Sequence, residues 1–493
     1  MNINCNDMNN KRLIINGLLA LLLVITASCE SWISVEPSDR LTEDEVFSSQ
    51  KGFLQSLNGI YAEMNNTNVY GGNLSVGVVD VLAQYYDGGT DNSYAYYYYS
   101  RYDYTATSAK ATFASVWSKM YSLISSVNIL LEKCDQADFL TPQYQRIIKG
   151  EALALRAMLH FDLLRLYGPV MPANGSEKAI PYVTVADQSI QDILTGDVVI
   201  GKVLQDLNEA SGLLASTDPV LTDGVRNNPR NGENIDFCYR QYRLNYFAVQ
   251  VLLARAHLWN GNKAEALAIA EDAISKAGPL FPFTTVATAT GAYPDRMFSS
   301  EVIFSLYNTN RINVFRKYFA PTLETRNILS FAGTLDSGRV PELYDSQNDL
   351  RYKMWSASAE GDNDLIFNKY EDVALKDGST SHYCYMMPLI RLSELYLIAA
   401  ECETDFSKAL SYVNTLRNKR NCPSLAPADA EALMSVIMSE FRKETIGEGQ
   451  MFFFYKRHAM QNIPNGSATS GDMNMLLKNY VVPIPESEID NRL

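Results

Sequence analysis

The chain has 493 residues, of which 47% are hydrophobic and 20% are charged, and its formal net charge is −14. This is the composition of a globular protein rather than a disordered one, and the length is sufficient for a large buried core. The acidic balance, with no stripe rich in Lys and Arg, argues against nucleic acid as a partner, because nucleic-acid-binding proteins normally carry a basic footprint.

The first 28 residues have the pattern of a secretory signal peptide. A charged pair, Lys11-Arg12, precedes an apolar run at residues 13–27 that is too short for a comfortable membrane span. The sequence Thr26-Ala27-Ser28-Cys29 resembles a bacterial lipobox, although Thr26 stands where Leu is usual. We expect residues 1–28 to be a lipoprotein signal peptide and Cys29 to be lipidated, since several acyl chains together anchor a protein stably. The alternative is an ordinary secretory signal with an accidental cysteine.

Helical patterns dominate the chain that follows. Acidic residues at 43–45 predict a helix N-terminus, and the broad apolar arc of residues 151–167 predicts a helix that is covered on more than one side. Two helical hairpins are predicted, one from 243–259 and 263–276 and one from 389–402 and 406–419. Small alanines at their contacts are typical of tetratricopeptide-like repeats.

Long irregular tracts separate these helices, at residues 66–110, 170–198, 215–240 and 281–385, and residues 301–305 indicate a strand. Loops of this length in a compact protein usually carry function or minor structure of their own. The sequence therefore predicts a mostly α protein, with helical hairpins and long irregular loops that carry a few short strands, in one compact body.

Eight weak motifs follow one another along the chain. They lie at residues 29–37, 117–128, 156–170, 253–262, 300–304, 388–397, 400–420 and 483–491. In this order they resemble the SusD/RagB family of outer-membrane nutrient-binding lipoproteins. One departure lies at residues 440–457, where Phe441 follows Glu440 in place of Arg, and an aromatic run follows Gly449 in place of Arg-Trp-Asp-Leu. This departure leaves the subfamily open.

The resemblance implies a SusD-like fold, with an N-terminal region at 29–230 and a C-terminal region at 231–493. It also implies a binding protein rather than an enzyme, held on the cell surface by its lipid anchor. Such a protein delivers its ligand to a SusC-like TonB-dependent transporter of the outer membrane. An oligosaccharide is the expected ligand, and an oligopeptide, which some RagB-like members bind, is the alternative. A surface hydrolase and a purely structural lipoprotein also stay open.

No catalytic or metal-binding motif is present. The four histidines are far apart, and the chain has no HExxH, no nucleophile elbow, no phosphate-binding loop and no dinucleotide fingerprint. The sequence therefore indicates neither a cofactor nor a metal. Five cysteines remain after Cys5 is removed and Cys29 is lipidated, and we expect them to be small buried hydrophobic residues.

Several charged motif residues are expected to be structural. We interpret Arg391 and Glu394, and likewise Arg156, Asp162 and Arg165, as members of buried pairs that tie helices together.

A tyrosine-rich tract at residues 85–104 is the candidate ligand site. Nine tyrosines occur in it, and such rings pair a flat apolar face with a hydroxyl, which suits a sugar. Polar groups for the sugar hydroxyls are available at Asp87 and Asp103. The candidate ligand-binding residues are Tyr85, Tyr86, Asp91, Asn92, Tyr94, Tyr96, Tyr98, Arg101, Tyr102 and, from a second tract at 306–355 that also holds Arg311 and Tyr318, Trp355. The alternatives are that the first tract packs on the transporter or on the protein's own core.

Overall fold

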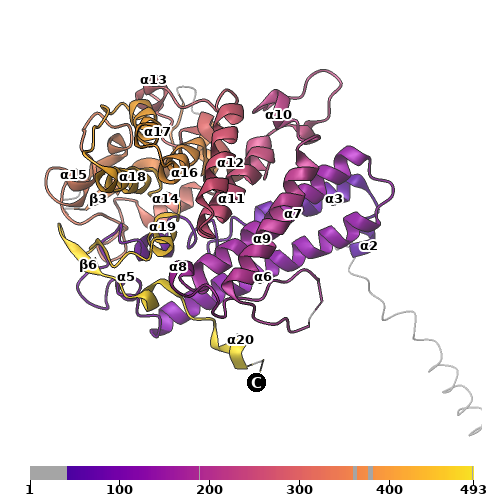
Figure 1. Ribbon diagram of the computed structural model, residues 1–493, viewed down its shortest axis with the longest axis horizontal. Helices are drawn as coiled ribbons and strands as arrows, with labels where there is room; N and C mark the ends of the chain where they lie inside the picture. Colours follow the sequence, from indigo (N-terminus) through magenta and orange to yellow (C-terminus); the bar gives the residue numbers. More distant parts are fainter. Residues whose placement is uncertain (1–41, 188, 359–363, 376–380, 491, 493) are drawn as a thin grey trace, which may run out of the picture. The chain divides into compact units, whose positions relative to one another are not determined.

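The computed structural model describes residues 42–493 except 188, 359–363, 376–380, 491 and 493 (Figure 1). The chain divides into two units, Met1–Gly52 and Phe53–Leu493. In the first, α2 (Glu43–Val46) begins with a capping box in which Thr42 and Glu45 each bind the other's backbone N–H. The predicted helix start is therefore confirmed. The signal peptide at 1–28 and Cys29 lie outside the described residues, and the boundary expected at residue 230 stays a prediction.

Long helices that stack in sequence order form the scaffold of the second unit (Figure 1). They are α3 (Gln50–Glu63, which begins in the first unit), α6 (Thr107–Gln136), α7 (Pro142–Tyr167), α9 (Gly196–Leu214), α11 (Tyr246–Trp259), α12 (Lys263–Ala277), α16 (Leu392–Cys402), α17 (Phe406–Lys419) and α18 (Ala430–Glu444). Helix α7 packs on α6 and α9, α11 packs on α9 and α12, and α16 packs on α12, α17 and α18. Both predicted hairpins, α11–α12 and α16–α17, are confirmed.

Helix α7 is buried on nearly every face, as its broad apolar arc predicts. Its buried polar side chains are therefore paired, with a neighbouring helix, with a loop or within α7 itself. Arg156 makes two hydrogen bonds to Asp206 of α9, at 2.7 and 2.8 Å. Asp162 pairs with Arg165 and accepts a hydrogen bond from the Tyr70 hydroxyl at 2.7 Å. The structural role expected for these motif residues is confirmed.

The long tracts between the helices carry short elements. The helices are α4 (Val78–Leu82), α5 (Tyr97–Ser100), α8 (Met171–Asn174), α10 (Val220–Asp223), α13 (Val286–Thr290), α14 (Ile312–Tyr318), α15 (Arg339–Leu343), α19 (Met451–Arg457) and α20 (Glu486–Asp490). The 3₁₀ turns are η1 (Ile235–Phe237), η2 (Arg240–Tyr242), η3 (Ser299–Glu301), η4 (Tyr352–Met354), η5 (Asn368–Tyr370), η6 (His382–Tyr385) and η7 (Leu477–Tyr480). The strands are β1 (Val302–Tyr307), β2 (Trp355–Ala357), β3 (Leu365–Phe367), β4 (Met386–Arg391), β5 (Asn462–Pro464) and β6 (Asp472–Asn474).

The strands form antiparallel pairs, β1 with β4, β2 with β3 and β5 with β6. In the first pair Val302 lies opposite Arg391. The strand expected at 301–305 is thus present from Val302. The helix expected from residue 389 begins only at Leu392, because residues 386–391 pair with β1 instead. A short apolar run fits a strand and a helix equally well, so the sequence pattern could not separate them.

A network of buried charges, called here the buried ion network, joins η3, β4, α17 and α18 and the loops beside them. Its basic members are Arg351, Lys369, Arg391, Arg417, Arg420 and Lys443, and its acidic members are Glu301, Asp345, Asp349, Glu440, Glu444 and Glu448. Glu444 lies at its centre and accepts hydrogen bonds from Arg351, Arg391 and Arg420 at 2.9, 2.6 and 2.6 Å. Arg391 does not pair with Glu394, which follows it by three residues, but with Glu448. Glu394 pairs with Arg255.

Replacing Glu444 with Gln should destabilise the fold by about 3–5 kcal/mol, because it leaves buried guanidinium groups without their counter-charge. Burial opposes ionisation of Glu444, but the charges of Arg420, Arg391 and Arg351 outweigh it and hold the pKa well below its usual value. The stabilisation that ionised Glu444 gives the fold is fully present above the ordinary Glu pKa of about 4.3. It is lost as the pH falls through the lower pKa of the folded state. Urea unfolding of the wild type and of Glu444→Gln at several pH values between neutral and acid measures this stabilisation. The free energy of unfolding should fall less steeply with acid in the variant than in the wild type.

The matched control is Glu486→Gln, which removes a carboxylate from an exposed ion pair with Lys110. It should change the free energy of unfolding by less than about 0.5 kcal/mol. Equal effects of the two substitutions would contradict a structural role for the network.

Candidate functional site

A pocket of about 440 Å³ lies at the tyrosine-rich tract. We call it the Tyr94 pocket. Its lining comes from residues 87–94, from residues 325–334 and from Asp364, which precedes β3. The lining residues are Asp87, Tyr94, Thr325, Ile328, Ser330, Phe331, Ala332, Gly333, Thr334 and Asp364.

Backbone hydrogen bonds hold the two main lining segments together. The Asp87 N–H donates to the Ser330 carbonyl at 2.8 Å, and the Ala95 N–H donates to the Arg326 carbonyl at 2.9 Å. Between these two points Gly89 has a φ of +76°, and a Cβ there would lie 2.0 Å from the Tyr94 ring. Glycine is therefore required, both for the backbone conformation and for the ring that packs on it.

The pocket combines one aromatic wall with oxygen groups. One carboxylate oxygen of Asp87 accepts the Gly89 N–H at 2.8 Å, and its other oxygen takes no hydrogen bond from a described residue. The Thr325 hydroxyl donates to Asp364 at 2.7 Å. The Ser330 hydroxyl at the floor accepts the Leu365 N–H at 2.8 Å. Such a site can place a ligand ring against Tyr94 and accept hydrogen bonds from hydroxyl groups.

An aromatic cluster supports the pocket from beneath. Phe331 of the lining packs on Tyr85, Tyr86 and Trp355, with ring centroids 5.9, 5.8 and 4.5 Å apart. Tyr85 and Tyr86 have no exposed surface, and Trp355 has 6%. The expectation that these three side chains contact a ligand is therefore wrong, because the core surrounds them. They form the underside of the site.

Tyr102, also expected to contact a ligand, belongs to the core. It is 7% exposed, and its hydroxyl is occupied inside the protein, donating to the Leu82 carbonyl at 2.9 Å and accepting from the Gln84 side chain at 3.1 Å. Arg311, from the second candidate tract, is also buried, and its guanidinium donates to the Tyr383 carbonyl. Neither side chain offers a free face to a ligand.

The remaining predicted residues lie outside the lining of the Tyr94 pocket. Asp91 and Asn92 are exposed, whereas Tyr96 and Tyr98 are half-buried. The Arg101 guanidinium lies 3.8 Å from the centre of the Tyr97 ring and donates to the Gly89 carbonyl at 2.8 Å. Arg101 therefore fastens the turn on which Tyr94 sits. A direct ligand contact for these residues stays a prediction.

Four polar lining residues, Thr325, Ser330, Thr334 and Asp364, were not named among the sequence candidates, although the first three lie within the second candidate tract at 306–355. They lie more than 230 residues from Tyr94. Hydroxyl and carboxylate side chains are common in any loop, so only the three-dimensional pairing of the segments identifies them.

Helix α18 fixes the start of the tyrosine-rich tract. Arg442 donates to the Gln84 carbonyl at 2.7 Å, while the Tyr85 hydroxyl donates back to the Arg442 carbonyl at 2.7 Å. Asp80 of α4 accepts the Gly447 N–H at 2.6 Å and the Gly449 N–H at 3.1 Å. The chain therefore enters the site from a turn that is bonded on both sides to α18 and the loop after it.

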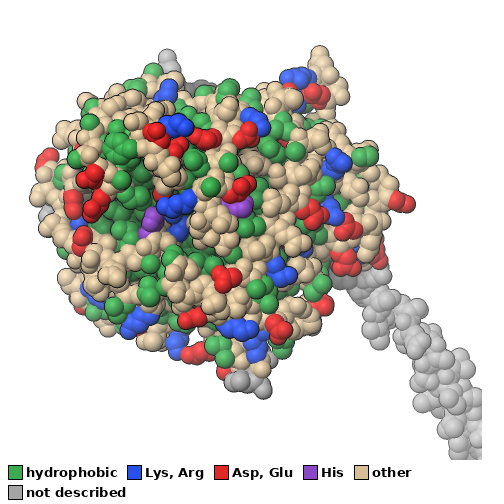
Figure 2. All heavy atoms as spheres, in the orientation of Figure 1, with side chains coloured by type: hydrophobic (Ala, Val, Ile, Leu, Met, Phe, Trp, Pro, Cys, Tyr) green, Lys and Arg blue, Asp and Glu red, His purple; other side chains and the backbone are tan. Residues whose placement is uncertain are grey.

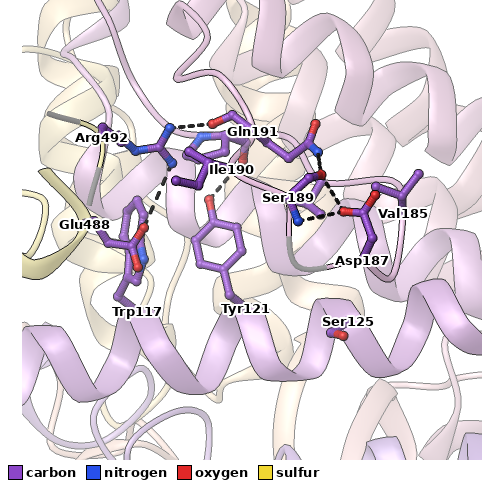
Figure 3. A pocket seen from close by; sticks show the side chains of 12 residues that line it. Trp117, Tyr121, Ser125, Val185, Asp187, Ser189, Ile190, Gln191, Glu488 and Arg492 are labelled. Atoms are coloured by element: carbon purple, nitrogen blue, oxygen red, sulfur yellow. Dashed lines mark hydrogen bonds and ion pairs between the residues drawn. The ribbon is translucent and has the colours of Figure 1, made fainter. Parts of the chain in front are cut away.

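Another pocket, of about 310 Å³, lies between α6 and residues 181–191 (Figure 3). The Tyr121 side chain points from α6 toward this pocket but donates its hydroxyl to the Pro181 carbonyl at 2.9 Å. Ser189 binds Asp187 and accepts from Gln191, and Arg492 donates to the Gln191 carbonyl (Figure 3). Because its polar groups largely satisfy one another, this pocket is the weaker candidate for a ligand.

Acidic and basic side chains are interspersed over the face shown in Figure 2, with hydrophobic atoms gathered in the area of α18 and α19. Among the described residues, no helix combines the length and the apolarity that a bilayer span requires. Over the same ranges, no three His, Cys, Asp or Glu side chains are placed to hold a metal ion. Cys134, Cys238, Cys384, Cys402 and Cys422 are buried and free, which confirms their expected role as small core residues.

Comparisons with known proteins agree with this architecture. A family model described as starch-binding, associating with the outer membrane, matches residues 31–222, and the SusD family model matches residues 356–492. The SusD-like protein P25 of Formosa agariphila is 21% identical over 500 residues, which cover 88% of each chain. The SusD-like protein P38 of the same organism is 24% identical over 204 residues, covering 41% of this chain and 37% of its own.

Solved structures share the fold. A putative sugar-binding protein from Bacteroides vulgatus superposes with a TM-score of 0.67 at 24% identity, covering 89% of this chain and 96% of its own. A SusD superfamily protein from Bacteroides thetaiotaomicron gives a TM-score of 0.67 at 21% identity, covering 90% and 98%. The predicted SusD-like, mostly helical fold is thus confirmed. With two family models that together span more than half of its residues and this shared fold, the chain belongs to the SusD/RagB family.

Proposed function

We propose that this protein binds an oligosaccharide in the Tyr94 pocket and hands it to a TonB-dependent transporter. The observation that carries the proposal is the pocket itself, with one aromatic wall among carboxylate and hydroxyl groups. A sugar ring presents C–H groups to such a wall and hydroxyl groups to oxygens like those of Asp87 and Asp364. Relatives described as sugar-binding share the fold, which adds support.

An oligopeptide is the alternative ligand. Extended peptides are commonly bound by strand addition, which needs an exposed strand edge beside the pocket. Here the lining residues Asp87, Tyr94 and 325–334 lie in loops, and Asp364 only precedes β3. The pocket therefore favours a ligand recognised through its hydroxyl groups.

The proposed place of action is the outer surface of the outer membrane, with the protein held there by lipid on Cys29. The family model that covers residues 31–222 is described as associating with the outer membrane, which supports this location. Partnership with a SusC-like transporter rests on the family resemblance. Membranes of the producing cell, solubilised in detergent, test it by co-purification, and a tagged protein that brings down no barrel protein would favour a scaffold role instead.

Tyr94→Ala should weaken oligosaccharide binding by about 1–3 kcal/mol, the range of aromatic hot spots, and should change stability by less than about 0.5 kcal/mol. The matched control is Tyr246→Ala, which removes a half-buried ring of α11 that does not line the pocket and is not a ligand candidate. Calorimetric titration with a glycan found by array screening, together with a thermal melt, measures both effects. Equal losses of affinity in the two variants would contradict the assignment of the pocket.

Cys29→Ala should abolish lipid attachment and release the protein from the membrane fraction. The prediction rests on the signal-peptide pattern, in which a charged pair is followed by an apolar run and by small residues directly before Cys29. Labelling with radioactive palmitate followed by membrane fractionation measures it, and Cys134→Ala serves as the control. Palmitate incorporation that persists in Cys29→Ala would show that the anchor is elsewhere.

The bound oligosaccharide should be recovered chemically intact. Two carboxylates, Asp87 and Asp364, line one pocket, which is the observation that favours hydrolysis as the competing function. The chain carries no recognised catalytic motif and resembles a family of binding proteins, so we expect binding without turnover. Chromatography after prolonged incubation should show no product. Product that forms with the wild type and is lost in Asp87→Asn would establish an enzyme.

A further inference from the structure

A second polar pocket, of about 430 Å³, lies between the end of α3 and α14. We call it the asparagine pocket. Five asparagines line it, Asn65 and Asn66 after α3 and Asn308, Asn310 and Asn313 at α14. It has no lining residue in common with the Tyr94 pocket.

Two buried polar atoms at this pocket have no hydrogen-bond partner among the described residues. Tyr318 is only 2% exposed, and its hydroxyl is unpaired. The side-chain oxygen of Asn65 is likewise buried and unpaired, although its Nδ2 donates to the Tyr307 carbonyl at 3.1 Å. A buried polar atom without a partner is destabilising, so these two atoms indicate a partner that the described chain does not supply.

The unpaired hydroxyl is held in a fixed place. A Cβ at position 72 would lie 2.8 Å from the Tyr318 oxygen, and one at position 77 would lie 3.2 Å from it. Gly72 and Gly77 therefore leave room for the hydroxyl end of the Tyr318 side chain. The backbone on the other side of α14 is also fixed, because the Leu329 N–H donates to the Tyr318 carbonyl at 2.8 Å.

The lining matches an uncharged ligand rich in hydroxyl groups. Each asparagine amide both donates and accepts hydrogen bonds, as a sugar hydroxyl does. The side chains of Asn310 and Asn313 are exposed and make no hydrogen bond to a described residue. The lining carries one acidic and one basic side chain, Glu63 and Lys317. The Glu63 carboxylate pairs with Lys119 at 2.5 Å, and the Lys317 ammonium lies 4.9 Å from the centre of the Tyr318 ring. The lining therefore holds no cluster of like charges that would select a strongly charged ion.

We propose that the asparagine pocket is a second binding position for a neutral saccharide, separate from the Tyr94 pocket. Asn310 and Asn313 bind sugar hydroxyls at the mouth, and the Tyr318 hydroxyl and the Asn65 oxygen bind one at the base. The position does not depend on the proposed function of the Tyr94 pocket, since the two sites have no lining residue in common.

The test uses the mature protein labelled with nitrogen-15 at asparagine, titrated separately with glucose, galactose, mannose, N-acetylglucosamine, maltose and cellobiose. At least one of these sugars should shift the side-chain amide resonances of Asn65 and Asn66 in a saturable way. In the double variant Asn310→Ala and Asn313→Ala the affinity should fall by about tenfold, since two hydrogen-bonding partners are lost at exposed positions. Tyr94→Ala, the control, should leave the titration unchanged.

Tyr318→Phe separates a ligand contact from a structural role. It should weaken the sugar affinity by about fivefold while the melting temperature stays equal or rises, because only an unpaired hydroxyl is removed. The proposal is overturned if none of the six sugars shifts these resonances, or if the double variant or Tyr318→Phe binds as tightly as the wild type. A titration that is lost in Tyr94→Ala would show a single site at the Tyr94 pocket and would likewise overturn it.

Discussion

Charge neutralisation inside the C-terminal half is the constraint on which the rest of this structure depends. The buried ion network places six basic and six acidic side chains together, almost all of them with less than a tenth of their surface exposed. Removing each such charge from water costs several kcal/mol, so every member needs its partners in place. Glu444 alone binds three arginines that come from a loop, from β4 and from the end of α17. The network therefore holds these segments together in the arrangement of this structure.

The same constraint reaches the candidate ligand site through α18. Glu440 and Glu444 belong to the network, and Arg442, between them on the helix, holds the backbone at residues 83–84. Asp87 follows this turn by three residues and lines the Tyr94 pocket. The opposite wall, at residues 325–334, hydrogen-bonds to the same segment. Helix α18 thus fixes a site built from irregular loops. Its glutamates are paired within the buried ion network, and its Arg442 binds the backbone carbonyls that precede the site.

The sequence predicted the helical hairpins well, because their alanine-rich periodic faces are local patterns that α11–α12 and α16–α17 preserve. It failed at residues 389–391, where pairing with β1, a contact across more than 80 residues, overrides a helical pattern. The site shows the same limit. The tyrosine-rich tract was found, but Tyr85, Tyr86 and Tyr102 proved to be core, because composition cannot tell which ring faces inward. The lining from Thr325 to Asp364 depends on a pairing of loops that no local pattern records.

Hydrogen–deuterium exchange of the mature protein, with and without a saturating oligosaccharide, tests the central claim most directly. If the Tyr94 pocket is the ligand site, exchange of backbone amides should slow in residues 87–95 and 325–334 together, because the two segments form its walls. Slowing confined to residues 117–125 and 181–191, around the pocket of Figure 3, would contradict the claim and move the ligand site there.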